Sequence, residues 1–242
     1  MSIIFESRLS ESPLVERVWR SRCEQPGPFT SMAFNRVQLV VWSQEGKTYF
    51  TVRGPETLAT PAYCPVHEEF VGIVLRCGAY LPHLSPYALR DNMMTLPEAS
   101  ATTFWLTGCA WRFPTYDNAD TFVERLARSG LLVYEPVVEA ALQGRMDMDD
   151  LSLRSAQRRF LRATGLTHSA IRQIARARYA TTLLRRGASI FDAMAEASYF
   201  DQPHLTRSLR RFIGQTPAQL AGKTAHTERE QLSFLYKTSP VC

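Results

Sequence analysis

Residues 189–217, SIFDAMAEASYFDQPHLTRSLRRFIGQTP, decide how the last third of this 242-residue chain folds. Ser189 is a good N-cap residue, and the apolar residues after it recur at helical spacing, which predicts a short helix over residues 190–197. After a tight turn, Asp201 can cap a second helix that ends at Gly214. The apolar stripe of this second helix is Leu205, Leu209 and Phe212. A short helix, a tight turn and an arginine-bearing helix are typical of a helix–turn–helix that enters the major groove of DNA.

Two further helices are predicted before this unit. Ser152 is suited to cap a helix that ends at Gly165, and the apolar stripe of that helix is Leu153, Ala156, Phe160 and Ala163. A longer helix is expected over about residues 169–186. At roughly 1.5 Å per residue, it would span about 27 Å.

A shift of 49 residues superimposes the two arginine-bearing helices, which indicates an internal duplication. The matching pairs are Arg158 with Arg207, Phe160 with Leu209, Gly165 with Gly214 and Thr167 with Thr216. We therefore expect two helix–turn–helix units joined by the long helix, at a separation approaching the roughly 34 Å repeat of the major groove on one face of DNA. The alternative is a compact helical domain with a stiff central helix.

Charge is distributed unevenly along the chain. Residues 1–150 carry 13 Lys and Arg against 18 Asp and Glu, whereas residues 151–222 carry 12 Arg, no Lys and three acids. The helical segment thus holds a net charge of +9, and residues 1–150 hold −5. Cations concentrated on one module indicate a polyanionic partner, because binding to a phosphate backbone releases counterions. A solvated basic face is the alternative.

The stretch from Asp201 to Arg207 and the Gly-x-Thr-Pro ending at Pro217 resemble the second helix–turn–helix of AraC/XylS-type transcription regulators. Residues 152–165 resemble the recognition helix of the first unit. The sequence departs from the family pattern at two places. Ser198 stands where the family usually has a glycine in the turn, which predicts left-handed backbone geometry at this serine. No helix is apparent immediately before Ser152, since residues 144–150 have the wrong composition.

This resemblance implies a set of base-reading positions. They are Arg154, Gln157 and Arg158 in the first helix and Gln202, Pro203, His204, Thr206 and Arg207 in the second. Arginine can bind guanine O6 and N7, glutamine can bind adenine N6 and N7, and a proline supplies only apolar contact. The alternative for Arg158 and Arg207 is contact with phosphates, which is also the role expected of Arg210 and Arg211.

The first half of the chain is predicted to be β-rich. Strands are expected at residues 17–22, 37–42, 47–52 and 70–75, with a turn at residues 44–46, and flanking helices at residues 118–129 and 136–143. Short strands at modest spacing indicate a small barrel or sandwich. By position and strand content, this half resembles the cupin-like sensor domain of such regulators. The prediction is therefore an α+β protein of two domains, a β-rich domain over residues 1–145 and an all-α domain over residues 146–222. A tail follows over residues 223–242, in which residues 231–236 are apolar enough for a docked helix.

Few residues of the first half indicate catalysis. His67 and His83, with Glu68 or Glu69, form a possible three-ligand metal set, and a loop histidine is the alternative. Cys64 lies near His67, but no orienting partner or reactive motif surrounds this thiol. Four tryptophans suit either an apolar ligand pocket or the core: Trp19, Trp42, Trp105 and Trp111. We expect no metal, no cofactor and no catalytic residue.

The five cysteines are scattered and never form a Cys-x-x-Cys pair, which favours a reducing cytoplasm. No apolar run is long enough to span a bilayer, and no secretory signal is apparent. We interpret the chain as a non-enzymatic, sequence-specific transcription regulator that binds double-stranded DNA. Further partners to expect are a small-molecule effector, a second copy of the chain and, for an activator, RNA polymerase. The competing hypothesis is a cupin-type small-molecule enzyme with a helical appendage.

Overall fold

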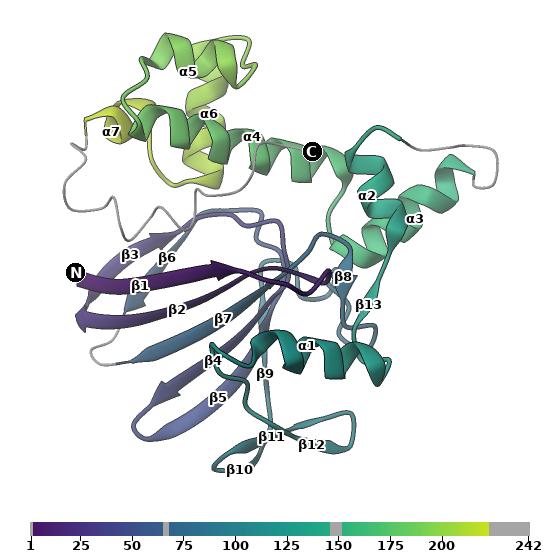
Figure 1. The fold of residues 1–242 in the computed structure, drawn as a ribbon. Helices are drawn as coiled ribbons and strands as arrows, with labels where there is room; N and C mark the ends of the chain where they lie inside the picture. The colour runs from purple at the N-terminus through teal and green to yellow at the C-terminus, as the bar shows by residue number, and fades with distance from the viewer. Residues whose placement is uncertain (1, 65–67, 146–151, 223–242) are drawn as a thin grey trace.

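A computed structural model describes residues 2–64, 68–145 and 152–222, and the amino-terminal half is built mainly from strands (Figure 1). Its main sheet has six antiparallel strands in the order β1-β2-β7-β4-β5-β9. In that order, these strands are Ser2–Leu9, Val15–Gln25, Glu69–Leu75, Gln38–Gln44, Lys47–Arg53 and Met93–Leu96. Three smaller sheets consist of β3 (Gly27–Ser31) with β6 (Thr60–Cys64), β8 (Ala79–Tyr80) with β13 (Val133–Tyr134), and β10 (Glu98–Ser100), β11 (Thr103–Leu106) and β12 (Cys109–Arg112).

The predicted hairpin in the main sheet is confirmed as β4 and β5. Gln44 pairs with Lys47, which leaves Glu45 and Gly46 as a two-residue turn. Both residues have positive φ angles, 51° and 77°, as the tight hairpin turn that matches the strand twist requires. The predicted strands at residues 70–75 and 17–22 are confirmed within β7 and β2.

The main sheet is open in the part of the chain that the structure describes. Its order begins with β1 and ends with β9, and each of these edge strands pairs with one neighbour. A closed barrel would need these two edges to pair with each other. A closed barrel is therefore not seen among the described residues, where the main sheet is open and three small sheets lie beside it.

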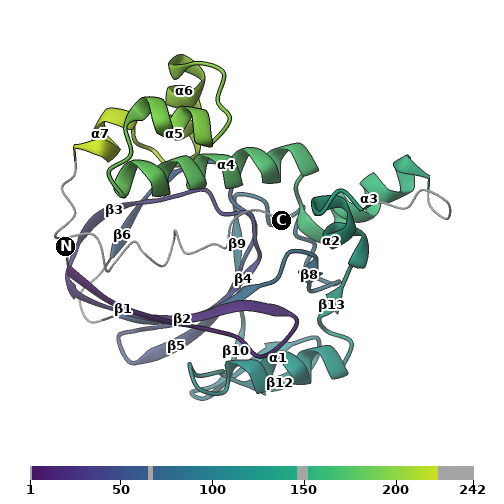
Figure 2. The same cartoon turned by 45° about the horizontal axis from the view of Figure 1, so that its top comes forward.

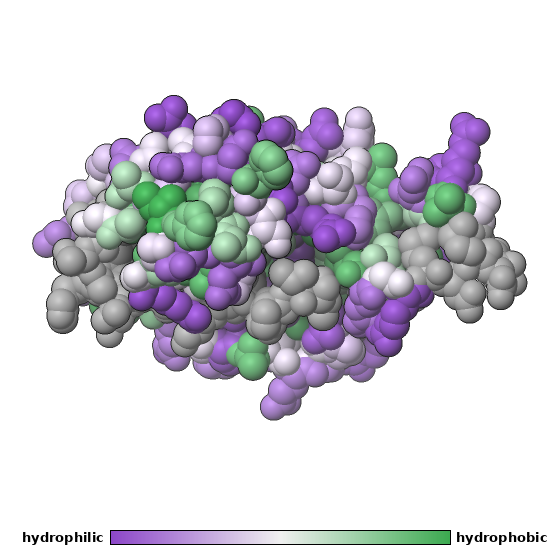
Figure 3. Space-filling view, turned by 90° about the horizontal axis from the view of Figure 1, so that it is seen from above, coloured by the Kyte–Doolittle hydropathy of each residue, from purple (hydrophilic) through white to green (hydrophobic). Residues whose placement is uncertain are grey.

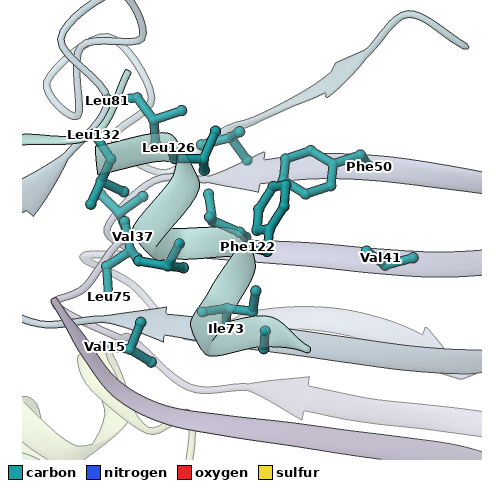
Figure 4. Close-up of a cluster of buried hydrophobic side chains, with 14 of the residues drawn as sticks. Val15, Val37, Val41, Phe50, Ile73, Leu75, Leu81, Phe122, Leu126 and Leu132 are labelled. Atoms are coloured by element: carbon teal, nitrogen blue, oxygen red, sulfur yellow. The ribbon is translucent and has the colours of Figure 1, made fainter. Parts of the chain in front are cut away.

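One face of the main sheet forms the first hydrophobic core with α1 (Ala119–Arg128) (Figure 4). Phe122 of α1 packs against Phe50 of β5, and Phe50 stacks on Phe104 with ring centroids 4.1 Å apart. Asn118 and Ser129 flank the helix as predicted, and Gly130 follows it with a φ of 69°. Aliphatic residues of the other strands belong to the same core. Packing the rings against them removes apolar surface from water, which stabilises the sheet and α1 together.

The remaining helices follow the predicted order, with one addition. They are α2 (Pro136–Leu142), α3 (Leu153–Thr164), α4 (His168–Arg185), α5 (Ile190–Glu196), α6 (Gln202–Phe212) and the unpredicted α7 (Pro217–Ala221). Figure 2 shows α4 to α7 on the side where β3 and β6 lie, and α1 with β10 and β12 on the opposite side. The boundary expected at residues 144–150 and the docked helix expected at residues 231–236 lie partly or wholly outside the described residues.

A second hydrophobic core joins the helices to the amino-terminal half. Residues of the first half that are buried among the helices are Met32, Ala33, Cys77, Tyr80 and Val138. Backbone hydrogen bonds accompany this packing, because the N–H of Ala33 donates to the Phe212 carbonyl and the N–H of Ala59 donates to the Arg211 carbonyl, both at 2.8 Å. Carbonyls at a helix end have no partner within the helix. The amino-terminal half therefore caps the end of α6.

None of the described helices combines the length and the apolar character needed to cross a bilayer.

Candidate nucleic-acid interface

The helix α6 has two chemically different faces. Its apolar stripe is buried against the other helices, with Leu205 and Leu209 at 0% exposure and Phe212 at 4%. On the opposite side, five of the predicted site residues are exposed: Gln202, Pro203, Arg207, Arg210 and Arg211. Thr206 and His204 are half-buried. A helix that buries one stripe and presents amide and guanidinium groups on the other can place donors against a groove of DNA.

The amino-terminal end of α6 is held by its predicted cap. The Asp201 carboxylate accepts a hydrogen bond from the backbone N–H of His204 at 2.6 Å, and Pro203 occupies the first turn. Proline is tolerated there because the first N–H groups of a helix have no partner in the helix. The turn that carries the exposed residues therefore has a defined geometry.

The segment between α5 and α6, residues 197–201, makes the tight turn of a helix–turn–helix. Ser198 has a φ of 57°, which confirms the left-handed geometry predicted where the family usually has glycine. Tyr199 points inward at 5% exposure, and its hydroxyl shares a 2.8 Å hydrogen bond with the Ser208 hydroxyl. Burial raises the pKa of Tyr199, so its hydroxyl stays protonated and available for this bond.

Arg176 of α4, which sequence analysis did not single out, supports the same turn. Its guanidinium lies 4.4 Å from the centre of the Tyr199 ring and donates to the Ser198 carbonyl at 3.4 Å. The guanidinium also contacts the His204 ring, with Nη2 3.5 Å from Nε2. His204 is thus engaged with α4 and with Tyr199, whose ring centroid is 5.1 Å away. No local pattern could reveal this role, because Arg176 and Ser198 belong to different elements.

The helix α3 repeats the two-faced arrangement. Ser152 accepts a hydrogen bond from the backbone N–H of Ser155 at 3.3 Å, and Gly165 ends the helix with a φ of 70°, both as predicted. The buried residues of the stripe are Ala156, Phe160 and Ala163. The predicted readers Arg154, Gln157 and Arg158 are all exposed. Leu153, which we expected in the stripe, is 57% exposed, because it begins the helix before the buried turn.

The two helices differ in the element that packs against them. α6 contacts α5, α4 and α7, whereas α3 contacts α2 and β8. Arg159 of α3 also donates to the Glu135 carboxylate before α2, with nitrogen–oxygen distances of 2.7 and 3.0 Å. The segment between α2 and α3 includes residues 146–151, outside the described part of the chain. A helix–turn–helix is therefore seen around α6, while around α3 its second helix alone is recognisable.

The amino-terminal half holds α3 and α6 by their carboxyl ends. A Cβ atom on Gly165 would stand 2.5 Å from the Pro86 carbonyl oxygen, and one on Gly214 would stand 2.7 Å from Cγ2 of Thr30. Such approaches are possible only without a side chain. These are the two glycines that the 49-residue shift superimposes, so equivalent ends of the duplicated helices meet the same half of the chain.

The exposed arginines of α6 are not neutralised by any carboxylate among the described residues. Arg159 of α3 forms an ion pair with Glu135, whereas no carboxylate that the structure describes pairs with Arg207, Arg210 or Arg211. Arg211 lies with its guanidinium 5.1 Å from the ring centre of Phe212. Charges that no carboxylate neutralises can meet phosphates or guanine edges.

The alternative sites in the first half find little support. His67 lies outside the described residues, and no three His, Cys, Asp or Glu side chains within them are grouped as metal ligands. Burial, followed by the neighbouring Cys23, raises the pKa of the Cys64 thiol to about 12. A thiol that stays protonated at neutral pH is a poor nucleophile.

The tryptophans do not share one site. Trp111 is buried in the first core, Trp42 stacks on Tyr49 at 4.4 Å, and Trp105 is 46% exposed. Trp19 lies over Gly72, where a Cβ would stand 2.0 Å from the indole ring. These tryptophans lie on four different strands, β2, β4, β11 and β12.

The fold places a helix–turn–helix in the carboxyl-terminal, helical part of the chain. Residues 149–223 match the model of a helix-turn-helix domain family, and this match supports an AraC-type regulator. Comparisons with curated proteins and with solved structures gave no match.

Proposed function

We propose that this protein is a sequence-specific transcription regulator that reads double-stranded DNA with α6 and α3. The observation that carries the proposal is the two-faced α6, which buries Leu205 and Leu209 completely and exposes Gln202 and Arg207. Gln202 begins α6 and Arg207 lies in its middle, and an amide and a guanidinium are the groups that bind adenine and guanine edges in the major groove.

The residue roles follow from their chemistry and position. The proposed base readers are Arg154, Gln157, Arg158, Gln202, Pro203, His204, Thr206 and Arg207, and the proposed phosphate contacts are Arg210 and Arg211. Because His204 is half-buried against Arg176 and Tyr199, we place it at the edge of the reading surface. The other proposed base readers lie in the first half of α3 or α6, whereas the amino-terminal half contacts the carboxyl ends of these helices.

We propose that α3 and α6 act on successive major grooves. The 18 residues of α4 separate them, which corresponds to about 27 Å of helix. With the offsets between helices, this approaches the roughly 34 Å groove repeat. One chain would then contact two grooves, as a double helix–turn–helix of residues 146–222 beside a region of residues 1–145.

For the amino-terminal half, we propose effector binding or self-association, which is the role of a cupin-like sensor domain. Its main sheet is open. Effector binding would bias DNA binding by linkage between two sites. The small pocket between Asn35, Cys77 and Thr164 has a volume of about 10 Å³, far below the roughly 300–1,000 Å³ of small-molecule sites, so we place no effector there. Contact with RNA polymerase as an activator belongs to the same proposal, and we assign no catalytic activity.

Selection of bound duplexes from random DNA, with the full chain, tests this function. The wild-type chain should enrich one motif, and Arg207→Ala should lose preference at one position of it. Arg112→Ala, which removes one exposed charge from β12, is the matched control and should leave the motif unchanged. A uniform loss of affinity for Arg207→Ala, with a salt slope smaller by about one, would instead place Arg207 on a phosphate. Failure of the wild-type chain to enrich any motif would contradict the proposal.

A further inference from the structure

The most exposed large apolar side chain in the described part of the protein lies next to the proposed reading surface. Phe200 is 92% exposed, compared with 75% for Leu9 and 72% for Phe191. It directly precedes Asp201, the N-cap of α6. Figure 3, which views the molecule from above, shows a group of hydrophobic residues among hydrophilic ones on this face.

The fold does not use the apolar surface of Phe200. A hydrophobic residue just before an N-cap often packs against the fourth residue of the helix and so fixes the entry of the chain. The fourth residue of α6 is Leu205, which is 0% exposed and buried in the helical core. Tyr199 is the turn residue that is buried beside α6, while Phe200 remains in solvent. The ring therefore contributes little to stability in the free protein.

Phe200 is followed in the chain, after Asp201, by two exposed residues of the first turn of α6. These are Gln202, which carries an amide, and Pro203, which has no backbone N–H to donate. Arg207 and Arg210 are exposed further along the same helix. The leading, amino-terminal end of α6 thus exposes the side chains of Phe200, Gln202 and Pro203, and exposed arginines follow later in the helix.

The chemistry of the major groove limits what an apolar side chain can contact there. Guanine, cytosine and adenine present hydrogen-bonding groups, whereas thymine adds a C5-methyl group, which phenylalanine can contact. Burying a phenyl ring against unpaired donors or acceptors would cost free energy. An apolar pair at the leading end of a reading helix therefore selects thymine.

We propose that Phe200, with Pro203, contacts thymine C5-methyl groups, and that Gln202 reads an adenine beside them. The half-site under α6 is then rich in A·T pairs. This inference rests on the proposed function, and it adds a residue, Phe200, that the family-derived positions do not include.

The test uses the duplex selected by the full wild-type chain. Thymines in the α6 half-site are replaced one at a time by deoxyuridine, which removes only the methyl group. At the contacted position, the wild-type chain should bind the deoxyuridine duplex roughly fourfold more weakly. Phe200→Ala should bind both duplexes equally, at about the level of wild type on deoxyuridine. Phe191→Ala, an exposed phenylalanine of α5 in the same unit, should retain the full methyl dependence.

Three outcomes would overturn the inference. The first is that no deoxyuridine substitution changes the affinity of the wild-type chain. The second is that Phe200→Ala lowers the affinity for both duplexes by the same factor relative to wild type, and the third is that Phe191→Ala also loses the methyl dependence. In each case, an enriched motif that depends on Arg207 would leave the proposed function standing. Thermal unfolding of Phe200→Ala should match that of wild type, because the ring is solvent-exposed, and this excludes misfolding as the cause.

Discussion

The backbone N–H of Ala33 donates a 2.8 Å hydrogen bond to the carbonyl of Phe212, the last residue of α6. Arg178 of α4 reinforces this junction, because it is 3% exposed and its Nη1 donates to the Ala33 carbonyl at 3.1 Å. Ala33 is thus bonded to α6 through its N–H and to α4 through its carbonyl. The two halves of the chain are therefore expected to unfold together rather than as independent domains.

Replacing Arg178 with alanine should destabilise this junction. The change removes the hydrogen bond to Ala33 and the contact with the Phe34 ring, whose centre is 4.9 Å from the guanidinium, and it leaves a cavity. We expect a loss of about 2–4 kcal/mol in the free energy of unfolding, measured by urea denaturation. Arg172→Ala, on the exposed side of the same helix, should change it by less than about 0.5 kcal/mol. Equal effects of the two changes would contradict the junction described.

Gly165→Ala should cost more than Gly187→Ala, although both glycines have positive φ angles of 70° and 94°. At Gly187 a Cβ meets nothing within 4 Å, so only the backbone strain of about 1–2 kcal/mol applies. At Gly165 the same atom would stand 2.5 Å from the Pro86 carbonyl oxygen, which adds about 1–3 kcal/mol. Thermal or urea unfolding of the two variants measures the difference, and an equal cost would mean that Pro86 does not pack against α3.

Leu209→Ala should lower the free energy of unfolding by about 2–5 kcal/mol, because the side chain is 0% exposed in the helical core. Arg210→Ala is the control, since this neighbouring side chain is exposed and should affect DNA affinity far more than stability. A near-neutral Leu209→Ala would mean that the buried and reading faces of α6 are assigned the wrong way round.

Stability should fall as the pH rises above about 9 because of Cys64. Burial raises the pKa of this thiol from 9.0 to about 12, so between these values the unfolded chain releases a proton that the folded chain retains. The contribution is complete below pH 9 and is lost as the pH rises towards 12. In urea unfolding at several pH values, the free energy of unfolding should therefore fall more steeply with pH for wild type than for Cys64→Ala. The two slopes should differ by up to about 1.4 kcal/mol per pH unit.

Alkylation provides an independent check on the same thiol. Cys109 is exposed, whereas Cys23, Cys64 and Cys77 are buried. Iodoacetamide at pH 8, followed by peptide mapping, should modify Cys109 rapidly and Cys64 only on unfolding. Rapid modification of Cys64 in the folded chain would contradict its burial.

Elements whose signals are local could be predicted before the structure was known. Ser152 and Asp201 cap their helices, Gly165 ends α3, and Ser198 adopts the left-handed conformation expected of its place in the turn. The hairpin turn at Glu45 and Gly46 was likewise predicted from a local signal. Caps and turns depend on hydrogen bonds and dihedral angles within about four residues, so the chain carries the whole signal in one short stretch.

Strand order and the packing between halves depend on residues that are distant in the chain. β2 pairs with β1 on one side and with β7 on the other, an order that the prediction of a small barrel or sandwich did not specify. Arg178 and Ala33 are 145 positions apart, and Arg176 supports a turn 22 positions away. In the sequence, both arginines resemble any other cation of a basic helix. Only folding buries one of them and sets the other against Tyr199, because long-range contacts arise from the global arrangement of surfaces and leave no periodic pattern in the local sequence.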